Sequence, residues 1–494
     1  MSMEDKSTRT DFIRGDAGVD AGRTDPGGME VMVFSVGLIK KVIVAIKTLV
    51  IIVMAKYLYL LMAVIGLIDF INKILSMTNI LSGFIGKAVN VTFVTLLIAG
   101  SMVWSTGGAK AQVAGSIINP GFEDQATGTD KKVAAGWLPY EQGYKRVKAA
   151  HTGAWGITLQ SDRSNPGTAG AYQRIDLQQG EIKPVQITGY IKGDRIVNQA
   201  GGWFGASLYA EIYLQDGSVV YWNSVPNFGT FGWRWIGFNT GTLAAVNQPI
   251  DHIFLVPILG DARGQAWFDD IAVKEHEPGV GVVTIMFDDG ELSTYEEALP
   301  AMEKQGWQGS TAVITEMVDE DGFMGWEQLQ ALQRKGWEVV SHGITHEDLT
   351  TLSVNKVKQE LNNSKRQLER KGLVVNHFAL PFGAYNAEIM ALGTKSYKSV
   401  RAYEQGSNPV GILPWEVKVH GVTTATDSAT IADWVNEAKN KGQWIVIVYH
   451  KIAEMGDDAY FTTPSDLEEM LQTISDSGIE VVTYNQGWEK FGAL

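Results

Sequence analysis

Hydrophobic and polar positions divide the chain into four stretches with different patterns. Residues 1–30 are polar, rich in Gly and Asp and without periodicity, which predicts a disordered N-terminus. Residues 31–112 are predominantly apolar, residues 113–276 alternate in short runs, and residues 280–494 alternate between apolar runs and helical patterns. A chain of 494 residues is too long for one core, so two or three domains are expected.

The apolar stretch is predicted to be a membrane or export segment. The run TLVIIVMAKYLYLLMAVIGLI at 48–68 is long enough to span a bilayer, although Lys56 lies within it. A second apolar run at 88–104 is followed by an Ala-x-Ala pattern at 109–111, which is typical of a secretory signal. Two interpretations stay open: a retained anchor or a segment removed on export. Two spans would return the rest of the chain to the cytoplasm, so a single export element at 88–104 is favoured, which places the rest of the chain in the cell envelope or secreted.

Residues 113–276 are predicted to form an all-β sandwich. Short alternating strands are separated by turn residues, and no amphipathic helix pattern interrupts them. The opening INPGFED at 118–124 and the closing AWFDDIAVKE at 266–275 resemble jelly-roll carbohydrate-binding modules. That resemblance implies a sugar-stacking face, for which the candidates are Trp137, Tyr140, Trp155, Trp203, Trp222, Trp233 and Trp235. The alternatives are core or sheet-surface positions for these rings, and a spacer role for the domain.

The last stretch has the pattern of a β/α barrel. Its strand-like runs are VVTIMF, STAVIT, WEVVS, NHFALPF, YKSVRAY, WIVIVYH and IEVVTY. Helical patterns lie between several of them, one begun by a capping box from Ser293 to Glu296 and one capped by Ser353. Such alternation implies a mostly parallel sheet that is closed, or nearly closed, into a barrel.

Polar side chains stand where four of these strands end. Asp288 and Asp289 follow the first strand, and the other ends carry the pair His342 and His346, the turn Pro381-Phe382-Gly383, and His450. In a parallel barrel the C-terminal ends of the strands surround one opening. The sequence therefore predicts that two carboxylates and three imidazoles meet there.

These residue types indicate a metal site. Adjacent carboxylates repel one another unless a positive charge or a shared proton relieves them. Two histidines four residues apart can direct two imidazoles at one point, and one aspartate completes a set that leaves positions open for water and substrate. The second aspartate is then free to take a proton from water that the metal has made acidic, and His450 can protonate a leaving group.

Composition and motif chemistry exclude several other classes. The formal net charge of −14 argues against a nucleic-acid partner, because phosphate binding needs clustered Lys and Arg. The absence of cysteine excludes disulfides and thiolate chemistry. The segment HGITH lacks the glutamate of the H-E-x-x-H peptidases. A non-haem iron oxygenase uses the same ligand types, but it needs neither a second aspartate nor an opposing histidine.

Four motifs in order, FDDG, SHGITHEDL, PFG and VIVYHKI, resemble those of the polysaccharide deacetylases of the NodB-homology group, carbohydrate esterase family four. The resemblance covers residues 280–494. It implies a distorted (β/α) barrel and metal-dependent removal of acetyl groups from an N- or O-acetylated glycan, such as a chitin-like polymer, peptidoglycan, xylan or an exopolysaccharide. An inactive deacetylase-like carbohydrate-binding protein of the cell envelope is the alternative.

The resemblance also implies a role for each motif residue. The expected ligands of one divalent ion, preferably zinc, are Asp289, His342 and His346. Asp288 is expected to be the general base and His450 the general acid. The backbone N–H of Phe382 is the expected oxyanion donor, with Pro381, Val448 and Trp415 around the substrate pocket.

Two departures from the family pattern raise further candidates. The family commonly has an Arg two residues before the motif proline, to orient the base, but this chain has Ala379 there. Arg401 or Lys418 could supply the missing charge. No acid that would tune the catalytic histidine is evident, and Glu416 is the best candidate for that role. The expected partners are the glycan and, through the N-terminal segment, a membrane.

Overall fold

The computed structural model describes residues 115–494, apart from 129–131, 164–166, 200–203, 457–458 and 494. The predicted disordered N-terminus (1–30) and almost all of the region before the β-sandwich, including the membrane or export segment (31–112), lie outside the described residues. Within the described part of the chain, no helix combines the length and the apolar character needed to cross a membrane.

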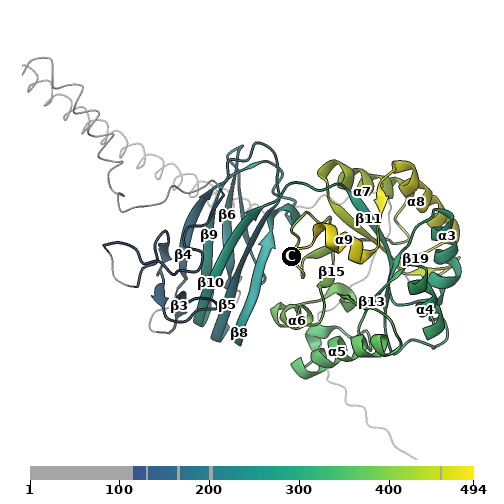
Figure 1. The fold of residues 1–494 in the computed structure, drawn as a ribbon, viewed down its shortest axis with the longest axis horizontal. Coiled ribbons are helices and arrows are strands. Elements are labelled where there is room, and N and C mark those ends of the chain that lie inside the picture. Colours follow the sequence, from purple (N-terminus) through teal and green to yellow (C-terminus); the bar gives the residue numbers. More distant parts are fainter. Residues whose placement is uncertain (1–114, 129–131, 164–166, 200–203, 457–458, 494) are drawn as a thin grey trace, which may run out of the picture. The chain divides into compact units, whose positions relative to one another are not determined.

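The first described region consists of two antiparallel sheets of five strands (Figure 1). One sheet has the order β1 (Leu138–Glu141), β4 (Ala169–Asp176), β9 (Ile250–Gly260), β6 (Gly205–Leu214) and β7 (Val219–Asn223). The other has the order β2 (Lys145–Val147), β3 (Gly156–Ser161), β10 (Ala262–Glu275), β5 (Val185–Asn198) and β8 (Gly229–Asn239). Inward side chains from both sheets, such as Leu255 and Phe268, share one hydrophobic core, as expected for a sandwich. The jelly-roll assignment stays a prediction.

The aromatic residues expected on a sugar-stacking face occupy separate environments. Trp137 is a core residue whose indole N–H donates to the carbonyl of Asn119 at 3.1 Å. The ring of Trp155 lies under the guanidinium of Arg146, and Trp203 is outside the described residues. Trp137 and Trp155 therefore already pack against other parts of the protein. The seven candidate rings do not all belong to one sugar-stacking face.

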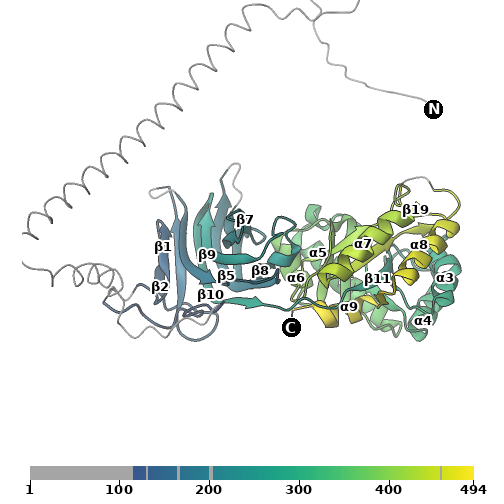
Figure 2. The ribbon, with the colours of Figure 1, turned by 90° about the horizontal axis from the view of Figure 1, so that it is seen from above.

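Seven parallel strands in the C-terminal region close into a barrel (Figures 1 and 2). They are β11 (Val282–Phe287), β12 (Ser310–Val313), β13 (Glu338–Ser341), β14 (His377–Ala379), β15 (Ser399–Gln405), β16 (Val417–Gly421) and β17 (Trp444–Tyr449). The strand β11 pairs with both β17 and β12, which closes the ring. The helices around it are α3 (Leu299–Lys304), α4 (Trp326–Arg334), α5 (Val354–Arg370), α6 (Ala387–Gly393), α7 (Ser428–Lys441), α8 (Pro464–Ser477) and α9 (Tyr484–Phe491).

Six of the predicted strands belong to this barrel, but the seventh barrel strand was not predicted. The run at 479–484 forms only β20 (Glu480–Val481), which pairs with β11 beside the ring. The missing member is β16, whose sequence VKVHG is short and half polar. The Ser353 cap is confirmed, because its hydroxyl accepts the N–H of Lys356. The Ser293 capping box is wrong, since that hydroxyl accepts the N–H of Ile452 instead.

Side chains alternate between the barrel interior and the helices. On β11, Val282 and Met286 belong to the inner cluster, whereas Val283 and Ile285 pack against the helices. Parallel strands that are buried on both faces read as continuous apolar runs, which is why the first and last barrel strands were clear in the sequence. The alternation extends past the ends of the strands, so it sets which polar residues face inward at either end of the barrel.

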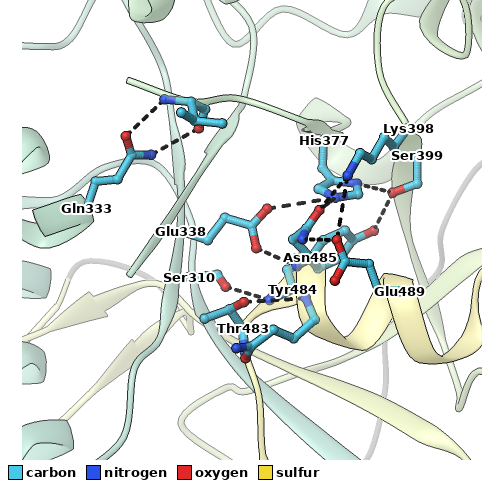
Figure 3. Close-up of polar contacts among 12 residues, drawn as sticks. Ser310, Gln333, Glu338, His377, Lys398, Ser399, Thr483, Tyr484, Asn485 and Glu489 are labelled. Atoms are coloured by element: carbon cyan, nitrogen blue, oxygen red, sulfur yellow. Dashed lines mark hydrogen bonds and ion pairs between the residues drawn. The ribbon is translucent and has the colours of Figure 1, made fainter. Parts of the chain in front are cut away.

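A buried polar network lies at the other end, where the strands begin (Figure 3). The first residues of four successive strands take part: Ser310, Glu338, His377 and Ser399. Asn485 of α9 donates its backbone N–H to Glu338, and its side-chain oxygen lies 3.1 Å from Nε2 of His377. The N–H of Tyr484 donates to the hydroxyl of Ser310 at 2.9 Å. The network thus binds the first turn of α9 to the barrel floor.

Burial shifts both titratable groups of this network towards their neutral forms. Burial raises the pKa of Glu338 to about 7, against the opposing effects of the Asn485 N–H and of Lys398. Burial lowers the pKa of His377 to about 3. The folded barrel therefore keeps a proton on Glu338 at pH values where the unfolded chain has lost it.

We predict that Glu338→Gln reduces the pH dependence of stability. The pKa of Glu338 is above the ordinary value of 4.5 in the folded protein, so the free energy of unfolding of the wild type decreases as pH rises from about 4.5 to 7. The loss amounts to roughly 3 kcal/mol. The amide keeps an acceptor for the Asn485 N–H but does not ionise. Melting temperatures of the full chain at pH 5 and pH 8 should therefore differ less for Glu338→Gln than for wild type; equal differences would contradict this.

Candidate active site

The polar strand ends surround one pocket of about 500 Å³. Its lining comes from the C-terminal ends of the barrel strands and the segments that follow them: Asp288, Asp289, Glu291, His342, His346, Leu380, Phe382, Tyr403, His450, Lys451, Gly456, Tyr460 and Phe461. The barrel topology explains this convergence, because each of these segments lies at the same rim. The two carboxylates and three imidazoles expected from the sequence are thus side by side.

Three of these residues present donor atoms to a common point. The Oδ1 atom of Asp289 lies 3.4 Å from Nε2 of His342 and 3.5 Å from Nε2 of His346. All three donor atoms lie within 4.8 Å of one another. Oδ1 of Asp289 is buried and has no hydrogen-bond partner among the described residues. Two imidazole nitrogens and one carboxylate oxygen in this arrangement fit a divalent cation of the zinc type, with positions left open.

The orientation of His342 is fixed from behind. Its Nδ1 lies 2.9 Å from the carbonyl oxygen of Ala379 on β14, so the N–H is donated there and the lone pair of Nε2 points into the pocket. His342 itself is buried and follows β13 directly. This backbone contact is one that the sequence did not reveal.

The turn between the two histidines is held by a residue that the sequence analysis missed. Glu360 of α5 is buried, and its carboxylate accepts the N–H groups of Ile344 at 2.6 Å and Thr345 at 3.2 Å. Gly343 has φ 85°, and a Cβ there would lie 3.1 Å from Oε2 of Glu360, so the turn fits closely around the carboxylate. One sequence signal could have identified Glu360: it is an acidic residue next to Leu361, on the side of α5 that the apolar pattern predicts to be buried.

Electrostatics keep Asp289 ionised. Burial by itself would raise its pKa, but the adjacent imidazole of His342, followed by those of His450 and His346, outweighs it and lowers the pKa to about 2. Burial lowers the pKa of His346. An ionised carboxylate and a neutral imidazole are the forms that bind a metal cation.

Asp288 has a separate partner. It is 2% exposed, and its Oδ2 atom lies 2.6 Å from Nη2 of Arg401, which is itself 1% exposed. Its Oδ1 atom is buried and has no hydrogen-bond partner in the described part of the chain. Arg401 lies on β15 directly opposite Ala379 in the parallel register. The candidates for the missing charge were Arg401 and Lys418. Arg401 is the one that reaches Asp288, from β15, the strand next to that of Ala379.

Backbone strain is concentrated at this rim. Asp289, His346 and Phe382 have φ values of 71°, 59° and 56°, in the left-handed region that non-glycine residues seldom adopt. Each such residue costs on the order of 1–3 kcal/mol, which the surrounding structure has to offset. The side chain of Phe382 is exposed and its ring centroid lies 4.7 Å from that of His346. Phe382 thus presents its backbone beside the candidate ligands.

Several residues expected around the pocket lie elsewhere. Val448 and Pro381 are buried beneath the rim and are not among the residues that line the pocket. Trp415, Glu416 and Lys418 lie where β16 begins, and none of them lines the pocket.

Each of these last three has a partner outside the barrel. The ring of Trp415 contacts that of Trp235, Oε1 of Glu416 accepts the N–H of Asn239 at 3.2 Å, and Nζ of Lys418 donates to the carbonyl of Thr242 at 3.1 Å. The assignments of Trp415, Glu416 and Lys418 to the site are therefore corrected. Without knowing where β16 runs, the sequence could not tell which end of the strand they occupy.

The barrel thus carries a candidate metal site of two histidines and one aspartate at its C-terminal rim, and known proteins are similar to it. The polysaccharide deacetylase family model matches residues 275–397, so this part of the chain is similar to that family. The matched range contains Asp288, Asp289, His342 and His346, whereas Arg401 and His450 lie beyond it.

Relatives of known sequence or structure are distant. YxkH of Bacillus subtilis (strain 168), itself provisionally named a polysaccharide deacetylase, is 24% identical over 127 residues, which cover 25% of this chain and 44% of YxkH. The chain thus matches less than half of that relative. Among solved structures, peptidoglycan deacetylase PdaC from Bacillus subtilis has a TM-score of 0.32 at 23% identity, covering 43% of this chain and 93% of PdaC.

The Xyl-CE4 domain of a multidomain xylanase from the hindgut metagenome of Trinervitermes trinervoides has a TM-score of 0.32 at 20% identity, covering 43% of this chain and 91% of that domain.

We predict that the full chain binds one zinc ion through the Asp289 cluster. At a free zinc concentration of about 100 times Kd, binding should stabilise the folded protein by about 2.7 kcal/mol. His342→Ala should lose both the calorimetric binding signal and the rise in melting temperature. His151→Gln, which removes a histidine of the β-sandwich, is the matched control and should retain both. Zinc stabilisation that survives His342→Ala would contradict the site.

Proposed function

We propose that the barrel domain is a metal-dependent deacetylase that hydrolyses N- or O-acetyl groups of an acetylated glycan. The main observation behind this proposal is that the two adjacent aspartates have different partners. Asp289 faces two imidazoles, whereas Asp288 is held by Arg401 with one oxygen left unpaired. The polysaccharide deacetylase match over residues 275–397 supports the same conclusion.

Asp289, His342 and His346 would hold the metal, and zinc suits their nitrogen-rich donor set best. When bound, such an ion supplies Lewis-acid chemistry, which polarises an acetyl carbonyl and acidifies water. The hydrogen bond from His342 to the carbonyl of Ala379 keeps the ligand nitrogen directed into the pocket.

Asp288 is the proposed general base. Arg401 occupies Oδ2 and holds the carboxylate in one orientation, so Oδ1 is the atom that takes the proton from the attacking water. A buried carboxylate without such a counter-charge would be costly to keep ionised, and the guanidinium offsets that cost. Arg401 thus pairs with the proposed base and fixes its orientation.

The remaining steps belong to Phe382 and His450. The backbone N–H of Phe382, in its left-handed conformation beside His346, is the proposed donor to the oxyanion that forms when water attacks. His450 approaches from the end of β17 and is proposed to protonate the departing amine nitrogen or sugar oxygen. Acetate and a free amino or hydroxyl group on the glycan are the products.

The alternative is an inactive deacetylase-like protein of the cell envelope that binds carbohydrate. Asp288 and His450 favour catalysis, because a protein that only binds sugar needs neither a base nor an acid. The discriminating experiment measures acetate release by the full chain from chitin oligomers, peptidoglycan, acetylated xylan and an acetylated exopolysaccharide, with and without chelator. No acetate from any of these glycans would favour the alternative.

The proposed substrates also fix the proposed location. Such glycans are polymers outside the cytoplasm, so the barrel would work in the cell envelope or after secretion. The lack of cysteine in all 494 residues suits an oxidising compartment. The predicted export segment would deliver the chain there.

We predict that Asp288→Asn abolishes acetate release while one zinc ion still binds. The amide keeps the size of the side chain and a hydrogen-bonding oxygen, but it cannot take a proton. The loss in kcat should be on the order of 100-fold or more, the usual contribution of a general base. Acetate release and calorimetry on the same preparation test this. Near-normal turnover by Asp288→Asn would refute the assignment of the base.

We predict that Arg401→Gln lowers kcat by about 10- to 100-fold, the usual effect of losing a partner that orients a site residue. Removing one member of a buried ion pair should also cost about 3–5 kcal/mol of stability. Arg401→Lys keeps the charge and should recover part of both losses. Arg334→Gln, at an exposed position on α4, is the control. Wild-type kcat in Arg401→Gln would show that Asp288 needs no such partner.

A further inference from the structure

Tyr403 is a pocket residue to which neither the sequence motifs nor the proposed mechanism assigns a role. It follows Arg401 by two residues on β15, so both side chains point into the barrel. Its ring lines the pocket and its centroid lies 6.2 Å from that of His450. Tyr403 is therefore close to His450, the candidate acid. It also lies two residues further along β15 towards the rim than Arg401, which pairs with Asp288.

Two glycines make the room that this side chain occupies. A Cβ at Gly421 would overlap the Tyr403 hydroxyl, and a Cβ at Gly383 would overlap the Cβ of Tyr403. Gly421 ends β16 and pairs with Val448 of β17, two residues before His450. The Tyr403 hydroxyl therefore occupies the space that a side chain at Gly421 would fill. This places it beside β16 and directs it towards β17, the strand that ends before His450.

Two complementary atoms in this region lack partners. The hydroxyl of Tyr403 and Nδ1 of His450 are both buried, and neither has a hydrogen-bond partner among the residues that the structure describes. A buried polar atom left unpaired costs about 1–3 kcal/mol. Glu416, the carboxylate expected beside His450, instead accepts the N–H of Asn239. The position behind the imidazole is thus open to another group.

We propose that Tyr403 is the positioning residue of His450, with its hydroxyl paired to Nδ1 directly or through one water molecule. This inference rests on the proposed function, because His450 is the acid only if the domain is a deacetylase. The neutral phenol of Tyr403 would then take the place of the carboxylate that was expected beside the imidazole of His450.

The hydroxyl is suited to this role because it both donates and accepts hydrogen bonds. Burial, followed by the charge of Asp288, raises the pKa of Tyr403 to about 12, so the phenol stays protonated. When the imidazole carries two protons, Nδ1–H donates to the phenol oxygen and Nε2–H faces the leaving group. The proton on Nε2 then moves to the departing nitrogen or oxygen, and Tyr403 gives up no proton.

The first test separates positioning of the acid from general damage. In the full chain, Tyr403→Phe should lower kcat for release of acetate from an N-acetylated glycan on the order of tenfold, a part of the usual contribution of a general acid. KM and zinc binding should be unchanged. Hydrolysis of 4-nitrophenyl acetate, whose leaving group departs without a proton, should also be unchanged. Equal losses on both substrates, or no loss on the glycan, would overturn the inference.

A matched pair of variants sharpens this test. Gly421→Ala should displace the hydroxyl and reproduce the selective loss, because the new Cβ takes its place. Tyr385→Phe removes another hydroxyl that contacts β15, through Glu404 at 2.8 Å, but outside the pocket, and it should behave like wild type on both substrates. A selective loss in Tyr385→Phe but not in Gly421→Ala would contradict the proposed geometry.

A second measurement does not depend on turnover. In the full chain labelled with ¹⁵N-histidine, with His450→Gln to assign the signal, Tyr403→Phe should shift the Nδ1 resonance of His450 by several ppm. An unchanged resonance would overturn the inference even in an active enzyme. If wild type releases no acetate from any glycan, the proposed function fails, and the resonance alone decides whether Tyr403 pairs with His450.

Discussion

The rim of the barrel depends on two adjacent carboxylates that have separate partners. Asp289 faces the imidazoles of His342 and His346, and Asp288 is paired with the buried guanidinium of Arg401. Without these partners, the repulsion between two neighbouring acids at the end of an apolar strand would not be offset. The pairing gives the two residues different chemical capacities, although they are identical in type and consecutive in sequence.

The closed parallel barrel makes this pairing possible. Alternation along the strands keeps the interior mostly apolar and leaves polar residues at both ends. At the end where the strands begin, Glu338 and His377 join a network that anchors α9. At the other end, the same alternation directs Arg401 and Tyr403 inward, and Tyr403 lines the pocket. One end therefore stabilises the fold, while the other provides the chemistry.

The position of Arg401 shows that the positive charge beside Asp288 can come from a different strand than the family pattern predicts. The family pattern puts an arginine at the position of Ala379, and this chain has it directly opposite, on the adjacent strand. A side chain on β15 reaches the same point because register neighbours in a parallel sheet are about 4.8 Å apart. The proposed pairing of Tyr403 with His450 would be a second substitution of this kind, again from β15.

The sequence by itself determined the alternation of strands and helices, the strand ends that carry Asp288, Asp289, His342, His346 and His450, and the ligand types. These features are local, since apolar runs and short motifs are read without knowing what lies across the barrel. Only the tertiary structure decided that β16 completes the ring and that Arg401, not Lys418, reaches Asp288. It also decided that Glu360 holds the HGITH turn, and that Glu416 and Trp415 lie outside the pocket. Those outcomes depend on register and strand direction, which bring together residues that are distant in sequence and leave no periodic signal along the chain.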